Sequence, residues 1–250
     1  MILNYTLGLS IFAALLIGAY SQAVSHQIRV SGKTANISIA RLNADSGIEL
    51  GKSLLASGAT RNVAGSSFRM GFAVGRVRVH IENEAGKIDL NAAPLSMVAA
   101  GLNLADASRT TQQKILSEMT RMRASGQQFS STDQLHKLVG AATIAQEAIP
   151  RIFTVQSGNR FVTLKYAHQR LRKLLLERQS RFPDWTGNAT SGANTLIAAG
   201  YASDGTVYFQ SALLKPRPLL NSGFDIVSVK QLPGSWVVTE DDPQASALNL

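Results

Sequence analysis

The chain has 250 residues, a length that suffices for one large domain or for two small domains, each with its own core. Its 25 Lys and Arg residues outnumber its 16 Asp and Glu residues, and the net charge of +9 permits nucleic acid, anionic lipid or an acidic protein as the partner. The sequence has no cysteine, which excludes a disulfide framework and any zinc or iron–sulfur site with cysteine ligands.

The N-terminal part of the chain predicts a membrane segment. No charged side chain occurs from Ile2 to Val24, and a stretch of about 20 mainly apolar residues is long enough to span a bilayer as a helix. We favour an uncleaved anchor over a cleaved signal sequence, because the helical pattern continues beyond this stretch. Several small residues either let neighbouring helices approach within the bilayer or simply fill an apolar helix: Gly8, Ala13, Ala14, Gly18 and Ala19.

A stripe of small and apolar residues extends this helix to about Ser57. The stripe repeats at spacings of three and four residues, and no proline interrupts it. One helix of about 80 Å would then run from the membrane into the globular part. The alternative is a plain membrane tether followed by a separate first helix. We take four members of the stripe as the candidate partner-binding face: Ile37, Ala44, Ile48 and Leu55.

A sheet begins after a polar loop that follows the long helix. Residues 76–82 alternate apolar with polar side chains, which is typical of a strand with one buried face. The chain then turns, and Asn91 precedes a helical pattern that has Pro94 in its first turn. Because the short side chain of asparagine accepts a backbone N–H at helix starts, we predict that Asn91 is a structural cap.

Residues 91–150 predict a compact all-helical unit. After the helix that Asn91 would cap, a second helix is expected at 107–122. A capping-box spacing at Ser131 begins a third helix, which Gly140 ends, and residues 142–149 predict one more short helix.

Strand patterns resume beyond this unit. A strand is predicted at 152–155 and a helix at 167–179. Apolar stretches on both sides of residues 203–205, Ser-Asp-Gly, predict a β-hairpin, and residues 223–232 predict a further strand. The sequence therefore predicts an α+β fold whose strands bracket the helical unit along the chain.

Four segments resemble a known family: LNADSGIELGKSLL, AGKIDLNAAP, FSSTDQLHKLVG and IPRIFTVQSG. They are similar, in this order, to four parts of the minor pseudopilin K family (general secretion pathway protein K) of the type II secretion system. These parts are the end of the long helix, a Gly-Lys-hydrophobic-x-Leu-Asn-x-Ala signature, a helix entry, and the return of the chain to the sheet. The resemblance covers residues 37–160 best.

The resemblance implies a pilin-like fold. In such a fold a long transmembrane helix packs on an antiparallel sheet, and a helical domain of helix-hairpin-helix or SAM-like type is inserted into the sheet domain. We expect residues 1–58 to form the transmembrane and amphipathic helix, residues 59–90 and 151–250 the two parts of the pilin-like domain, and residues 91–150 the inserted domain.

The resemblance also implies a structural, non-enzymatic function. The chain would act at the tip of the pseudopilus in the export of folded proteins across the outer membrane, with minor pseudopilins of the I and J types as partners. It would cross the bacterial inner membrane once, with its globular part in the periplasm. Since members of this family bind calcium, calcium is the cofactor that the resemblance implies, but Asp184, Asn188 and Asp204 are too sparse to define a site.

Other functions have weaker support in the residues. The four histidines are scattered and form no H-E-x-x-H motif. A second hypothesis is a membrane-anchored nucleic-acid-binding protein of a DNA-uptake apparatus, because residues 130–140 resemble the entry to a helix-hairpin-helix module. The second glycine of such a hairpin is missing, since Gly140 is followed by two alanines. Residues 165–181 hold six basic residues and one acidic residue, which indicates either a solvated helix face or a contact with an acidic subunit or anionic lipid.

Overall fold

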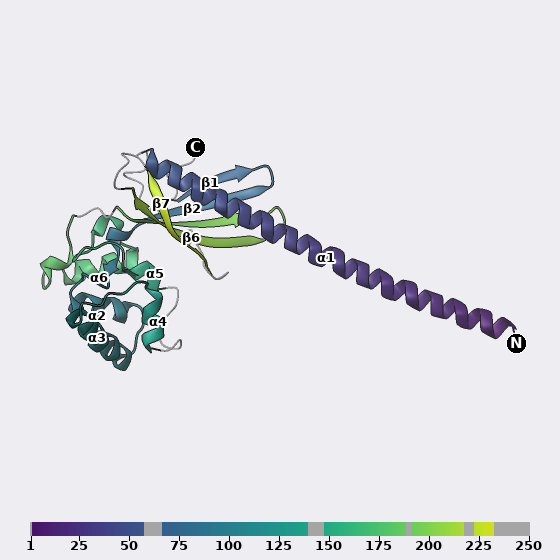
Figure 1. Cartoon of the computed structure of the whole chain (residues 1–250), viewed down its shortest axis with the longest axis horizontal. Coiled ribbons are helices and arrows are strands. Elements are labelled where there is room, and N and C mark those ends of the chain that lie inside the picture. The colour runs from purple at the N-terminus through teal and green to yellow at the C-terminus, as the bar shows by residue number, and fades with distance from the viewer. Residues whose placement is uncertain (1, 58–66, 140–147, 189–191, 218–222, 233–250) are drawn as a thin grey trace.

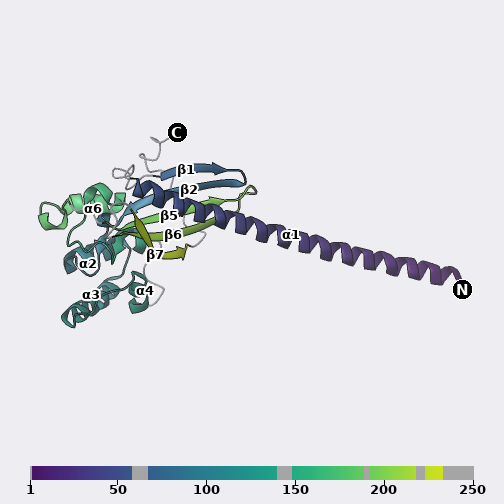
Figure 2. The ribbon, with the colours of Figure 1, turned by 45° about the horizontal axis from the view of Figure 1, so that its top comes forward.

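The protein consists of a long helix, a five-stranded sheet and a group of shorter helices (Figure 1). The computed structural model describes residues 2–57, 67–139, 148–188, 192–217 and 223–232, and of residues 2–14, 136 and 139 it describes the backbone alone. Helix α1 (Ile2–Ala56) lies across the sheet with its C-terminal part, while its N-terminal part projects far beyond it (Figures 1 and 2).

The sheet is antiparallel, with the order β1-β2-β5-β6-β7. Its strands are β1 (Ser67–Phe72), β2 (Gly75–Asn83), β5 (Asn194–Tyr201), β6 (Val207–Pro216) and β7 (Phe224–Gln231). The predicted α+β class, with a long helix on an antiparallel sheet, is confirmed.

Glycine allows α1 to approach the sheet closely. A Cβ atom on Gly200 of β5 would lie 2.0 Å from the carbonyl oxygen of Ala40, and one on Gly47 of α1 would lie 2.6 Å from Cγ2 of Val77. These positions accept no larger side chain without moving the helix. A first hydrophobic core, the sheet cluster, fills this contact: Ala44, Ile48, Val77, Val79, Ile81, Leu196, Ala198, Ala212 and Leu214.

The shorter helices form a second core. They are α2 (Leu95–Leu104), α3 (Arg109–Ala124), α4 (Asp133–Val139), α5 (Ile149–Ile152) and α6 (Gln169–Arg178), with 3₁₀ turns η1 (Glu84–Gly86), η2 (Leu164–Tyr166) and η3 (Pro183–Trp185). The short strands β3 (Ile88–Asp89) and β4 (Phe153–Thr154) pair in parallel among them. Their buried apolar residues extend from Ile88 to Trp185, and we call this group the helical cluster.

The segment that contains the helical cluster leaves the sheet and returns to it at two neighbouring strands. The chain leaves the sheet after Asn83 of β2 and returns at Asn194 of β5, which is the strand next to β2. Nδ2 of Asn83 donates a hydrogen bond of 3.1 Å to Oδ1 of Asn194. The helical cluster includes residues after position 150, so the predicted unit 91–150 accounts for only part of it, and the domain boundaries stay predictions.

The predicted elements can be compared with the described residues. The helices expected at 107–122 and 167–179 correspond to α3 and α6, and the expected hairpin corresponds to β5 and β6. Gly140, the predicted end of the third helix, lies outside the described residues, and so does most of the helix predicted at 142–149.

The predicted membrane segment lies in the projecting part of α1. Over the residues that the structure describes, no helix has both the length and the apolar character required to cross a membrane. Gly8, Ala13 and Ala14 belong to the part of α1 with undescribed side chains, whereas Gly18 and Ala19 are exposed. Membrane insertion therefore stays a prediction.

Candidate functional site

Between Ile28 and Leu42, helix α1 carries large apolar side chains that are mostly exposed, both before its contact with the sheet and on its first turns along the sheet. Exposed fractions are 66% for Ile28, 51% for Val30, 45% for Ile37 and 64% for Leu42. Val30 and Ile37 are seven residues apart, and Ile28 and Leu42 are fourteen apart, so each pair lies on one side of the helix. With 3.6 residues per turn, the two pairs face nearly opposite directions. We call them the Val30 face and the Ile28 face.

The predicted partner-binding face lies mostly inside the chain itself. Ala44 is fully buried, Ile48 is 3% exposed, and Leu55 packs partly buried against the sheet cluster. Ile37 is the member of the predicted face that is exposed. The stripe correctly indicated an apolar face, but this face contacts β2, β5 and β6 of the same chain, so Ala44 and Ile48 are core residues instead of a free surface.

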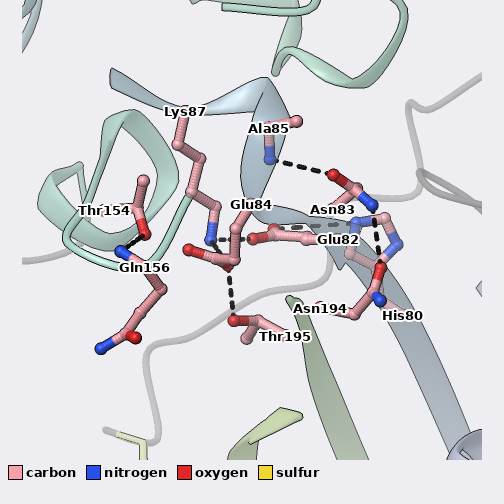
Figure 3. A network of polar contacts seen from close by, with 10 residues as sticks. All are labelled: His80, Glu82, Asn83, Glu84, Ala85, Lys87, Thr154, Gln156, Asn194 and Thr195. Carbon is pink, nitrogen blue, oxygen red and sulfur yellow. Dashed lines mark hydrogen bonds and ion pairs between the residues drawn. The ribbon is translucent and has the colours of Figure 1, made fainter. Parts of the chain in front are cut away.

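A buried ionic network joins the end of β2 to the start of β5 (Figure 3). The Nζ atom of Lys87 lies 2.8 Å from Oε2 of Glu82 and 2.9 Å from Oε1 of Glu84. Oγ1 of Thr195 donates a hydrogen bond of 2.6 Å to the same oxygen of Glu84. His80 lies at the edge of the network, with Nε2 3.7 Å from Oε1 of Glu82.

The two sides of this network stabilise each other's charged forms. Burial of the Lys87 ammonium favours its neutral form, but attraction to Glu82 and Glu84 outweighs this effect and raises the pKa of Lys87 above its usual range. Burial likewise opposes ionisation of Glu82, yet the attraction of Lys87 and then of His80 holds the pKa of Glu82 below its ordinary value. Lys87 and Glu82 therefore remain charged at neutral pH, and their ion pair fixes the point where the chain leaves the sheet.

Asn91 is not a helix cap, and this prediction was wrong. Helix α2 begins at Leu95, its capping position is Pro94, and no side chain caps it. Oδ1 of Asn91 instead accepts a hydrogen bond of 2.8 Å from the backbone N–H of Phe129, and Nδ2 of Asn91 donates one of 3.0 Å to the carbonyl oxygen of Phe129. The side chain thus clamps the backbone of the buried residue Phe129, which is distant in the sequence, through the same pair of groups that a neighbouring strand would use.

The turn that precedes α2 is held by Asp89. Oδ1 of this buried carboxylate accepts hydrogen bonds from the backbone N–H groups of Asn91 (2.8 Å) and Ala92 (3.2 Å). Its other oxygen, Oδ2, accepts from the Ser157 hydroxyl (3.0 Å) and the Gly158 N–H (2.8 Å). A charged residue within an otherwise apolar strand was the sequence signal for this role, and our sequence reasoning missed it.

The titratable residues form no metal centre in the parts of the chain open to inspection. Among the described residues, no group of three or more His, Cys, Asp or Glu side chains could hold a metal ion. The carboxylate of Asp204 already accepts hydrogen bonds from Thr206 and Asn36 of the same chain, and these bonds lower its pKa. Calcium binding has no site on these residues and stays a prediction.

Comparison with known proteins identifies the fold. No model of a known protein family and no curated protein sequence matches the chain. Among solved structures, the chain is similar to one chain of the GspK–GspI–GspJ complex of the type II secretion system of enterotoxigenic Escherichia coli. The sequence identity is 8%, the TM-score is 0.55, and the match covers 83% of this chain and 99% of the other. The protein therefore has a pseudopilin-like fold.

Proposed function

We propose that the protein is a minor pseudopilin of the K type, which acts at the tip of the type II secretion pseudopilus. In this role it binds neighbouring subunits and catalyses no reaction. The likeness of its fold to a chain of a complex of three pseudopilins supports a place in such an assembly. The assembly would serve the export of folded proteins across the outer membrane.

The observation that carries the proposal is the pair of opposite apolar faces on α1. An exposed apolar side chain is common at protein surfaces, but two such faces on one helix leave large apolar side chains in water on both of its sides. A neighbouring helix on each side would bury both faces at once, through the ridge-and-groove contacts that helices make. This arrangement fits two partners, for which we propose the I-type and J-type minor pseudopilins.

The proposed location follows from the uncharged segment 2–24, with which the projecting part of α1 begins. This segment would lie in the bacterial inner membrane as a single-pass anchor, with the globular part in the periplasm. Small residues of the segment would then face the helices of neighbouring subunits within the bilayer.

Coexpression with the I-type and J-type pseudopilins of the same genome tests the proposal. The double variant Val30→Asp/Ile37→Asp should lose one partner on copurification, and Ile28→Asp/Leu42→Asp should lose the other, because each places carboxylates where apolar helices would meet. Val74→Asp is the matched control, since Val74 is exposed in the turn between β1 and β2, and it should retain both partners. Retention of both partners by both double variants would refute the proposed interface.

The buried residue Ile48 is unsuited to this test. An aspartate at this position would place a carboxylate in the sheet cluster and destabilise the fold itself. Loss of a complex would then carry no information about the interface.

A further inference from the structure

The positive charge of the chain is concentrated around α6. Residues 165–181, which we call the basic segment, contain six of the 25 basic residues and a single acidic residue, Glu177. In the part of the chain that the structure describes, no carboxylate forms an ion pair with Arg170, Lys173 or Arg181. With Glu177 as the one acidic residue of the segment, the cations remain in excess and are available to an acidic partner.

Helix α6 presents these cations on a face that is fixed by its own packing. Leu171 and Leu175 are buried in the helical cluster and hold one side of the helix inward. Arg170, Lys173 and Leu176 lie on the exposed side, where Leu176 is 52% exposed. Glu177 is exposed as well and lies on the same side, four residues after Lys173, so this side combines two cations and one carboxylate with one large apolar side chain.

One further cation of the basic segment is held in place by aromatic rings. The guanidinium of Arg181 lies 5.3 Å from the ring centre of Phe182, within the range of a cation–π contact. The Phe182 ring stacks on Trp185 at 4.3 Å, with the planes 5° apart, and Trp185 is buried in the helical cluster. By contrast, Arg172 donates to the carbonyl oxygens of Leu164 and Lys165 and serves the fold.

We propose that the exposed side of the basic segment binds an acidic surface of another protein, with Leu176 inserted into an apolar hollow among the carboxylates. A central exposed leucine next to cations is typical of a protein interface, in which an apolar centre is surrounded by charged residues. A nucleic acid would instead offer phosphates to every exposed cation and no apolar partner to the leucine.

The position of α6 in the molecule argues against lipid as the ligand. Helix α6 lies at the end of the molecule opposite the N-terminus of α1 (Figures 1 and 2). This step rests on the proposed function, because residues 2–24 lie in the membrane only under that proposal. Only residues 25–56 of α1 lie beyond the proposed anchor, and this stretch is about 50 Å long, which still places the basic segment far from the headgroups around the anchor.

The test measures binding of the full chain to a fluorescein-labelled peptide of Glu-Glu-Leu repeats by fluorescence anisotropy. The double variant Arg170→Glu/Lys173→Glu should weaken binding by about tenfold, because it replaces two attractive charges by two repulsive ones. The control Arg109→Glu/Lys114→Glu changes the net charge equally at exposed positions of α3 and should leave binding within about twofold of the unchanged chain. Equal weakening by both double variants would overturn the proposal, because it would show a response to net charge alone.

Two further measurements separate the kinds of partner. Leu176→Ser should weaken binding of the Glu-Glu-Leu peptide and leave binding of a Glu-Glu-Ser peptide unchanged; an equal response of both peptides would contradict the role of Leu176. A random DNA duplex and vesicles of phosphatidylglycerol and phosphatidylcholine should bind more weakly than the Glu-Glu-Leu peptide at the same salt concentration. Tighter binding of either one would overturn the assignment to a protein. The α6 double variant should still copurify with the I-type and J-type pseudopilins, so failure here and failure of the proposed function are distinguishable.

Discussion

The clamp formed by Asn91 gives the sharpest test of the structure. Asn91→Ala removes two hydrogen bonds, of 2.8 and 3.0 Å, and leaves the N–H and C=O groups of the buried residue Phe129 without these partners. Unsatisfied buried groups of this kind cost about 1 to 3 kcal/mol each, partly offset by solvation. We therefore expect a total loss of about 2 kcal/mol. For a chain of this size, this loss lowers the thermal midpoint by roughly 4 to 8 °C.

Asn91→Asp separates a clamp from a cap. An aspartate cap would be as good as asparagine, so a capping role predicts no change in the midpoint. In the clamp, aspartate keeps the acceptor for the Phe129 N–H but loses the donor, and it sets a carboxylate oxygen against the Phe129 carbonyl. We expect Asn91→Asp to destabilise the protein about as much as Asn91→Ala, by about 2 kcal/mol.

Circular dichroism melts of the chain without residues 1–25 measure this difference. Asn103→Ala is the control, because Asn103 is exposed near the end of α2, and an exposed substitution should shift the midpoint by only about 1 to 2 °C. A midpoint of Asn91→Asp equal to that of the unchanged chain, together with a lowered midpoint of Asn91→Ala, would refute the clamp.

Three other predictions follow from the core and the ionic network. Gly200→Ala should lower stability by about 1 to 3 kcal/mol in urea titrations, because its methyl group would lie 2.0 Å from the carbonyl oxygen of Ala40; an unchanged urea midpoint would contradict the close helix contact. Lys87→Met should cost about 3 to 5 kcal/mol at pH 7, since it leaves the buried carboxylate of Glu84 and the half-buried carboxylate of Glu82 without their cation, and unchanged stability would contradict the network. The lowered pKa of Glu82 contributes stability above its ordinary value of 4.5, and this contribution is lost as the pH falls through the lower folded value. Unfolding free energies measured from pH 7 to pH 3 should therefore fall more steeply for the unchanged chain than for Glu82→Gln.

The sequence was informative wherever structure depends on local periodicity. The long helix was predicted to end near Ser57 and ends at Ala56, because one apolar stripe specifies both its conformation and its buried face. Strand β2 and the hairpin of β5 and β6 were recognised from alternation and from a turn sequence. Strand β1 was missed, because its sequence SFRMGF has little alternation and its pairing with β2 supplies the order.

The candidate sites depended on contacts that no local pattern contains. The stripe on α1 predicted burial but could not specify whether a partner or the chain's own sheet would cover it. Asn91 had a good local position for a cap, yet its partner Phe129 is 38 residues away. The pairing of Lys87 with Glu82 and Glu84 was within reach of the sequence, since the three charges lie close together in a segment that is otherwise apolar or small.

The return of the chain to a neighbouring strand has a consequence for the order of folding. Asn83 and Asn194 are 111 positions apart, and closing a flexible loop of this length costs about 4 kcal/mol of chain entropy. If the helical cluster forms first, it already holds Asn83 and Asn194 close together. The pairing of β2 with β5 then resembles the closure of a tight hairpin. Substitutions that weaken the helical cluster should therefore slow refolding, whereas substitutions in the sheet cluster should mainly accelerate unfolding. In this protein, the helices that lie outside the sheet would act as the template on which its central strand pair assembles.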